Sequence, residues 1–295
     1  MATKTEIKPT TKQAPFSEEE LQALIEKFLA IDAPDEKSFK RLNAFIRFYF
    51  SPTVVGLENI PDEPTLFIGN HAMFGLDGLI LMPTVYKETG RFLRALADNA
   101  WFQTSTGEKM ADSGMVLGHP DVCSALMEAG NDILVFPGGA AEANKRAEEK
   151  YSLVWRERYG FVRMAAQHGY NITPFGMVGP DDWWDHAIEG HDLLKSRPIK
   201  LLQKLGVIGD IREDLMPPLP RGLFNTLFPK PERCFLAFGE PIEVPDCRGR
   251  NVTKTIQKSV RARTAKAVES LVGDMLMKRA QYKHKEGTLR RLLTR

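Results

Sequence analysis

The chain is organised around residues 66–77, which read Leu66-Phe67-Ile68-Gly69-Asn70-His71-Ala72-Met73-Phe74-Gly75-Leu76-Asp77. The three apolar residues at the start of this stretch predict a buried strand, and the turn-forming pair Gly69-Asn70 ends it just before His71. From Gly78 onward, apolar residues indicate a buried helix, so Asp77 lies near a helix N-terminus, where a carboxylate is favoured. His71 is therefore expected at a strand end and Asp77 at a helix start.

This spacing lets His71 and Asp77 meet only if the histidine lies in the turn before the helix. On one regular helix, residues six positions apart are rotated by about 240°. Gly75 makes a suitable turn possible. Asp77 would then accept a hydrogen bond from one ring nitrogen of His71, and the other nitrogen could take a proton from a hydroxyl or water. The alternative is a histidine that caps a helix or closes a loop.

A second motif has the same form of strand, turn and helix. Residues 133–136 are an apolar strand, Pro137-Gly138-Gly139 is a turn, and Glu142 lies in the helix-forming run that follows. Glycines in such a turn let backbone N–H groups approach a ligand, and the helix start favours negative charge.

Together the two motifs resemble the glycerolipid acyltransferases, the family that contains the lysophosphatidic acid acyltransferases. Five residues separate His71 from Asp77, where most of the family has four. That spacing and the run Phe136-Pro137-Gly138-Gly139 are most similar to the branch holding diacylglycerol acyltransferase type 2 and the plant phytyl ester synthases. The resemblance covers roughly residues 52–245.

The resemblance implies an enzyme that moves a fatty acyl group from acyl-CoA to a hydroxyl of a glycerolipid or another lipid alcohol. His71 would be the general base and Asp77 would orient it. Backbone N–H groups around Gly138 and Gly139 would stabilise the oxyanion or bind phosphate. The implied substrate-binding residues are Asn70, Gly118, Phe136, Pro137, Gly138, Gly139, Glu142 and Pro174. No metal and no cofactor is expected, with acyl-CoA as the co-substrate.

The acceptor depends on one departure from the family pattern. Phosphate-accepting relatives carry an arginine where this chain has Gly118, which favours a neutral hydroxyl acceptor, although Arg91 or Arg94 could substitute for that arginine. Two other functions remain open. One is a lipid ester or thioester hydrolase with the same dyad, and the other is a non-catalytic lipid-binding protein.

Composition limits the class of protein. With 43% hydrophobic and 26% charged residues, the 295-residue chain is globular, and a net charge of +2 gives no reason to expect nucleic-acid binding. The three scattered cysteines argue against a disulfide framework or a zinc site. No signal-like segment and no 18-residue apolar run occurs. We therefore expect a cytoplasmic protein that contacts the membrane surface peripherally.

Three regions are expected along the chain. Residues 1–15 read as a disordered arm, residues 16–51 as two amphipathic helices beginning at a capping box at Ser17, and residues 52–295 as the acyltransferase domain with a C-terminal helix and a basic tail. The two helices either pack on the domain or face a bilayer. Residues 216–231 form an apolar, proline-rich loop that fills the core, edges the acyl channel or dips into lipid.

Strands expected around residues 54, 66, 92, 115, 133, 173 and 235 alternate with helices. This order predicts an α/β fold with a mixed, mainly parallel sheet flanked by helices. Both motifs would then lie at strand ends that face one crevice.

Overall fold

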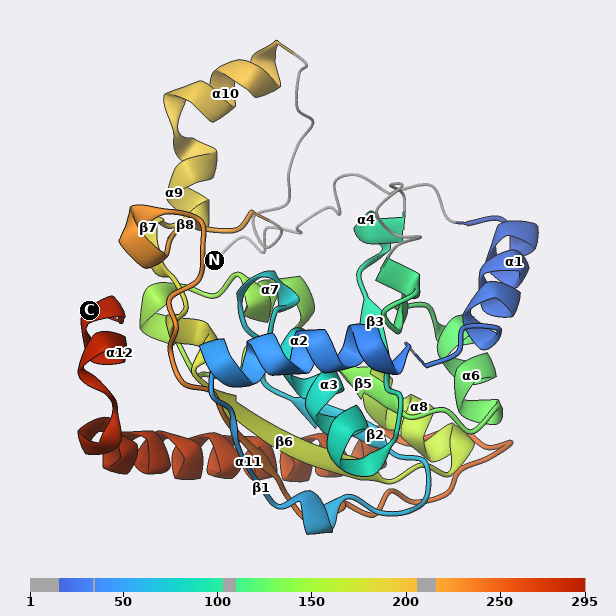
Figure 1. Cartoon of the computed structure of the whole chain (residues 1–295). Helices are drawn as coiled ribbons and strands as arrows, with labels where there is room; N and C mark the ends of the chain where they lie inside the picture. Colours follow the sequence, from blue (N-terminus) through green and yellow to red (C-terminus); the bar gives the residue numbers. More distant parts are fainter. Residues whose placement is uncertain (1–15, 34, 103–109, 206–215, 295) are drawn as a thin grey trace, which may run out of the picture.

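The computed structural model describes residues 16–33, 35–102, 110–205 and 216–294, so the predicted arm at residues 1–15 lies outside the described residues. Figure 1 shows a central sheet with helices on both faces. The strands are β1 Thr53–Val55, β2 Leu66–Gly69, β3 Arg94–Ala97, β4 Met115–Leu117, β5 Ile133–Val135, β6 Ile172–Val178, β7 Asp185–Ile188, β8 Leu219–Arg221 and β9 Phe235–Phe238. The α-helices are α1 Glu18–Leu29, α2 Glu36–Tyr49, α3 Gly78–Thr89, α4 Asn99–Phe102, α6 Pro120–Glu128, α7 Gly139–Ala143, α8 Gly160–His168, α9 Gly190–Lys195, α10 Arg197–Lys204, α11 Lys254–Tyr282 and α12 Thr288–Leu293.

Seven strands of the described chain form one sheet in the order β1-β9-β6-β2-β5-β3-β4. All neighbours are parallel except β6 and β9, which run antiparallel. The predicted fold class, a mixed and mainly parallel sheet flanked by helices, is confirmed. Because β2 and β5 are adjacent and parallel, the turns that follow them emerge at the same edge of the sheet.

One strand begins later than expected. The apolar run from Arg91 predicts a strand over residues 91–97, but β3 begins at Arg94. Arg91 instead donates from Nε to Asp132 Oδ2 at 2.7 Å and from a terminal nitrogen to the Glu63 carbonyl at 2.8 Å. These contacts hold Arg91 in the loop before the strand.

The sheet separates two apolar layers. Leu66 and Ile68 point into the layer formed with α6, α8 and α11, and Phe67 points into the layer with α2 and α3. This alternation follows from the two-residue period of a strand. Helix α11 crosses β6 closely at Gly176, where a Cβ atom would lie 2.7 Å from Leu271 Cβ.

The N-terminal helices pack on the domain along one side only. Ser17 and Glu20 form the expected capping box, and Phe28 of α1 is 1% exposed within the core. Helix α2 buries Ile46 but leaves Phe45 and Phe48 exposed.

A small second sheet, formed by antiparallel β7 and β8, was not expected from the sequence. Its strands are short and one contains a proline, so they carry little periodic signal. Helices α9 and α10 follow β7 and project away from the body of the molecule (Figure 1). None of the helices in the described ranges combines the length and the apolar run needed to cross a bilayer.

Candidate functional site

The turn between β2 and α3 brings His71 to Asp77. Phe74 and Gly75 both have positive φ angles, 61° and 68°, and reverse the chain between the two residues. Asp77 is the N-cap of α3. The His71 Nδ1 atom lies 2.8 Å from Asp77 Oδ2. The two residues expected to pair are thus in hydrogen-bond contact, and the turn supplies the geometry that one helix could not.

Several contacts fix the position of this pair. The Asp77 side chain is 1% exposed and also accepts from the Ala72 N–H at 2.7 Å and the Gly78 N–H at 2.9 Å. The His71 ring stacks on the Phe136 ring with centroids 4.1 Å apart and planes inclined by 15°. With Nδ1 held by Asp77, Nε2 is the ring nitrogen that can exchange a proton with a substrate.

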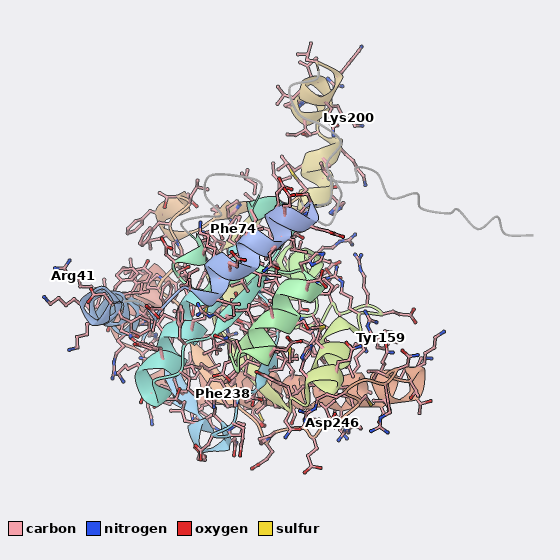
Figure 2. All side chains as sticks on the ribbon, turned by 90° about the vertical axis from the view of Figure 1, so that its right-hand side faces the viewer. Arg41, Phe74, Tyr159, Lys200, Phe238 and Asp246 are labelled. Carbon is pink, nitrogen blue, oxygen red and sulfur yellow. The ribbon has the colours of Figure 1, made fainter. Side chains whose placement is uncertain are left out.

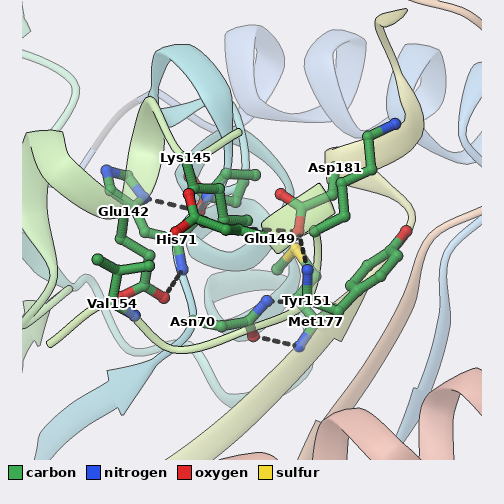
Figure 3. Close-up of polar contacts among 12 residues, drawn as sticks. Asn70, His71, Glu142, Lys145, Glu149, Tyr151, Val154, Met177 and Asp181 are labelled. Carbon is green, nitrogen blue, oxygen red and sulfur yellow. Dashed lines mark hydrogen bonds and ion pairs between the residues drawn. The ribbon is translucent and has the colours of Figure 1, made fainter. Parts of the chain in front are cut away.

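Asn70 fixes the end of β2. Its side-chain amide donates to the Met177 carbonyl at 2.9 Å and accepts from the Met177 N–H at 2.8 Å (Figure 3). The amide thereby continues the ladder between β2 and β6 by one step. Asn70 is 3% exposed, so the structure assigns it a contact that positions His71, and its expected contact with substrate remains a prediction.

Glu142 links the second motif to the first. From α7, its Oε1 accepts from the His71 N–H at 2.9 Å, and its Oε2 accepts from the Val154 N–H at 3.3 Å (Figure 3). The side chain is fully buried, and this burial raises the pKa of Glu142 to about 7, although Lys145 and the two hydrogen bonds act in the opposite direction. Gly138 makes room for it, because a Cβ atom there would lie 1.9 Å from Glu142 Oε2.

Lys145 is a site residue that the sequence did not reveal. It is 5% exposed, and its Nζ donates to the His71 carbonyl at 2.6 Å and pairs with Asp181 Oδ2 at 2.9 Å. From the sequence alone, the polar run at residues 144–150 predicts a solvated face. Lys145 lies just beyond the end of α7, so helical spacing from Glu142 gives no signal for its direction, which the loop after the helix sets.

A second missed residue, Arg158, holds the Pro-Gly-Gly turn. Its Nη1 donates to the Pro137 carbonyl at 3.1 Å and to the Gly138 carbonyl at 2.8 Å. Within the turn, the Gly139 N–H donates to the Phe136 carbonyl at 2.9 Å. The turn is therefore rigid, and the Gly138 N–H is its candidate donor toward a substrate.

A cavity of about 340 Å³ lies beside the pair, and the Phe136 ring that stacks on His71 forms part of its wall. Gly118 and Pro137 also line it, together with apolar side chains of β3, β5, α6 and α8, among them Leu96, Val135, Cys123, Phe161 and Met164. A predominantly apolar cavity of this size suits a hydrocarbon chain.

Other predicted residues lie apart from this centre. Pro174 is in β6 opposite Ile68, and it lines a separate cavity of about 550 Å³ with Gly239 and Leu271. Arg94 is 5% exposed and donates to Asn131 at 3.2 Å, while Arg91 is bound to Asp132. Both arginines precede or begin β3, whereas Gly118 follows β4, so neither reaches the cavity wall.

In the described ranges, no group of three or more His, Cys, Asp or Glu side chains is placed to hold a metal ion. The acidic residues after β6 are used in ion pairs instead. Asp182 contacts Lys150 at 2.9 Å and also pairs with Arg279. These contacts tie the loop after β6 to the loop at residues 147–154 and to α11.

Comparison with known proteins finds a matching family model, curated relatives and a solved structure. A family model described as Acyltransferase matches residues 51–178. Phytyl ester synthase 1 of Arabidopsis thaliana is 33% identical over 64% of this chain, which spans 29% of the plant protein. A DGAT1/2-independent enzyme synthesizing storage lipids from Bos taurus is 30% identical over 41% of this chain and 36% of its own length. The solved structure of the 1-acyl-sn-glycerophosphate acyltransferase PlsC from Thermotoga maritima has a TM-score of 0.45 at 15% identity and covers 85% of this chain and 87% of that one.

Proposed function

Because residues 51–178 carry the domain of the acyltransferase family, we propose that this protein transfers a fatty acyl group from acyl-CoA to a hydroxyl of a glycerolipid or another lipid alcohol. The observation that supports this reaction best is the His71–Asp77 contact of 2.8 Å beside an apolar cavity. An acyl transfer needs a base for the hydroxyl, a donor for the oxyanion and a dry groove for the chain.

In the proposed mechanism, His71 Nε2 removes the proton from the acceptor hydroxyl while the hydroxyl oxygen attacks the thioester carbonyl. Asp77 keeps the proton on Nδ1 and stabilises the imidazolium that forms. The Gly138 N–H donates to the oxyanion. When the carbon–sulfur bond breaks, His71 returns the proton to the leaving thiolate, so that the products are an ester and free CoA. No acyl-enzyme forms.

Glu142 and Lys145 position this machinery. They bind the N–H and the carbonyl of His71 respectively, so they hold its backbone from both sides. These backbone contacts orient the His71 ring and leave its Nε2 atom free to react.

The acceptor that fits this site best is a neutral alcohol. Arg91 and Arg94 are bound elsewhere, and the Arg158 guanidinium donates to the turn. Arg163 also lines the cavity, and its guanidinium contacts Gln257 of α11 at 3.4 Å. A diacylglycerol, a monoacylglycerol or a long-chain alcohol has no phosphate that would need a free cation. Such acceptors dissolve in membranes, which is why we propose that the protein works at the cytoplasmic surface of a membrane through peripheral contact.

The test is an incubation of the purified protein with labelled oleoyl-CoA and separate acceptors: lysophosphatidic acid, monoacylglycerol, diacylglycerol and fatty alcohol. His71→Ala should lower the rate of ester formation by roughly 10²–10⁴. His284→Ala, at an exposed histidine beyond α11, is the matched control and should keep full activity. Labelled free fatty acid without ester would identify a hydrolase. No turnover of any pair would contradict an enzymatic role.

A further inference from the structure

The loop at residues 222–229, called here the apolar loop, displays apolar side chains to solvent. Phe224 is 77% exposed, Leu227 71% and Phe228 49%. Burying these side chains in the core was one of the expectations from the sequence, and the structure shows that they do not fill it. A soluble surface seldom exposes such side chains together without a function.

The backbone of the apolar loop holds these side chains at the surface. Phe224 and Asn225 have φ angles of 52° and 61°, in the left-handed region that residues other than glycine seldom adopt. The Gly222 N–H donates to the Thr226 carbonyl and the Leu223 N–H to the Phe228 carbonyl, both at 2.7 Å. The exposed tip is therefore a fixed turn that holds a strained conformation.

Trp184 links the apolar loop to the turn between β2 and α3, which carries His71. Trp184 Nε1 donates to the Leu227 carbonyl at 3.0 Å, and the Trp184 ring meets the Phe74 ring edge to face, with centroids 5.4 Å apart. Phe74 lies between His71 and Asp77 and is itself 43% exposed (Figure 2). Whatever covers the apolar loop therefore lies beside the turn that carries the proposed base.

Helix α10 adds a second apolar surface to this side. Leu201 and Leu205 lie on one face with Leu202 beside them, and they are 56%, 65% and 36% exposed. Arg197, Lys200 and Lys204 lie on the side of the helix that adjoins this apolar face. Figure 2 shows Lys200 on this helix, well away from the rest of the molecule. An eight-residue helix is marginal alone in water, so its apolar face needs a partner.

We propose that the apolar loop and α10 dock this protein on an anionic phospholipid bilayer. This inference rests on the proposed function, since a lipid acceptor is supplied from a bilayer. The exposed apolar residues lie on two separate elements, and cations stand beside them on α10, a combination that suits an anionic lipid surface. Four basic residues and the single acid Asp192 lie in α9 and α10, and this excess of cations attracts anionic headgroups.

Docking in this way gives the acceptor alcohol a direct route from the bilayer to His71. The lipid surface covers Phe224 and Leu227 and approaches Phe74, so an alcohol that leaves the bilayer meets the His71 turn first. Phe228 extends the surface toward α2, because its ring contacts Tyr49 with centroids 5.4 Å apart. The exposed Phe45 and Phe48 of α2 form the rim on that side.

The first test is flotation with vesicles made of equal parts phosphatidylcholine and phosphatidylglycerol. Phe224→Asp/Leu227→Asp should weaken partitioning at least about tenfold, because two apolar side chains no longer enter the lipid. Met277→Asp is the matched control, since Met277 is 60% exposed on α11, a helix that runs on the far side of the sheet from α10 (Figure 1). A second variant, Lys200→Glu/Lys204→Glu, changes only exposed side chains and should lose the preference for the anionic vesicles.

The outcomes separate docking from catalysis. Loss of binding in the loop variant, with binding kept in Met277→Asp and His71→Ala, supports the docking surface even if no acyl transfer is found. Wild-type protein that stays unbound, or a loop variant that binds as the wild type does, overturns it whatever the turnover. Where transfer is found, the loop variant should keep its rate on a short-chain acceptor dissolved in water and lose it on diacylglycerol in vesicles.

Discussion

Glu142→Gln is the change that tests the buried network most directly. The amide keeps the shape of the side chain, so one oxygen can still accept from the His71 N–H. The amide nitrogen, however, faces the Val154 N–H, which now has no acceptor. Losing that hydrogen bond in a buried position costs about 1–3 kcal/mol in the free energy of unfolding.

The same substitution removes a pH dependence whose sign follows from the raised pKa. Burial moves the pKa of Glu142 from 4.5 to about 7, a difference that corresponds to about 3 kcal/mol. Between these values the folded protein keeps a proton that the unfolded chain releases. The contribution of Glu142 to stability is therefore complete below pH 4.5 and is lost as the pH rises through about 7.

The assay is urea unfolding followed by tryptophan fluorescence at pH 4.5 and pH 8. The wild type minus Glu142→Gln difference in unfolding free energy should decrease by about 3 kcal/mol between the two pH values. The variant should be the less stable protein at the lower pH, and the two proteins should become similar or reverse their order at the higher one. Glu58→Gln, at an exposed carboxylate, is the control for losing a charge in solvent.

A difference between wild type and Glu142→Gln that is equal at both pH values would refute this reasoning. It would mean that Glu142 ionises alike in the folded and unfolded chains. The hydrogen bonds from His71 and Val154 and the nearby Lys145 would then fully offset the cost of burial.

Three further substitutions test the surroundings of the site. Asp77→Asn should lower kcat by roughly 10²–10⁴ with little change in KM, because the imidazole loses the carboxylate that holds its tautomer; an unchanged kcat would remove Asp77 from the mechanism. Lys145→Met should cost about 3–5 kcal/mol in urea unfolding because it leaves Asp181 buried without its cation, and adding Asp181→Asn should restore part of that loss. Gly176→Ala should cost about 1–3 kcal/mol, because its Cβ meets α11, and a melting temperature equal to that of the wild type would contradict the close packing seen there.

Much of the fold was predictable because its signals are local. The apolar runs at residues 66–68, 133–135 and 172–178 lie in strands of the sheet, although β5 ends one residue before Phe136, and Ser17 caps α1 as its capping box predicts. The His71–Asp77 contact was predictable for the same reason, since both residues belong to one turn. The later start of β3 was not, because Arg91 is held by Asp132, which is 41 positions away.

By itself, then, the sequence determined the alternation of strands and helices, the strand ends that carry the two motifs, and the histidine and aspartate that pair across a single turn. Each of these depends on side chains within a few positions of one another, where periodicity and turn chemistry act. The tertiary structure alone decided the antiparallel place of β9, the β7–β8 sheet, the ion pair of Lys145 with Asp181 and the reach of Glu142 to the His71 N–H. Those contacts join residues tens of positions apart, and they form only where packing of the sheet and helices brings distant loops to one edge.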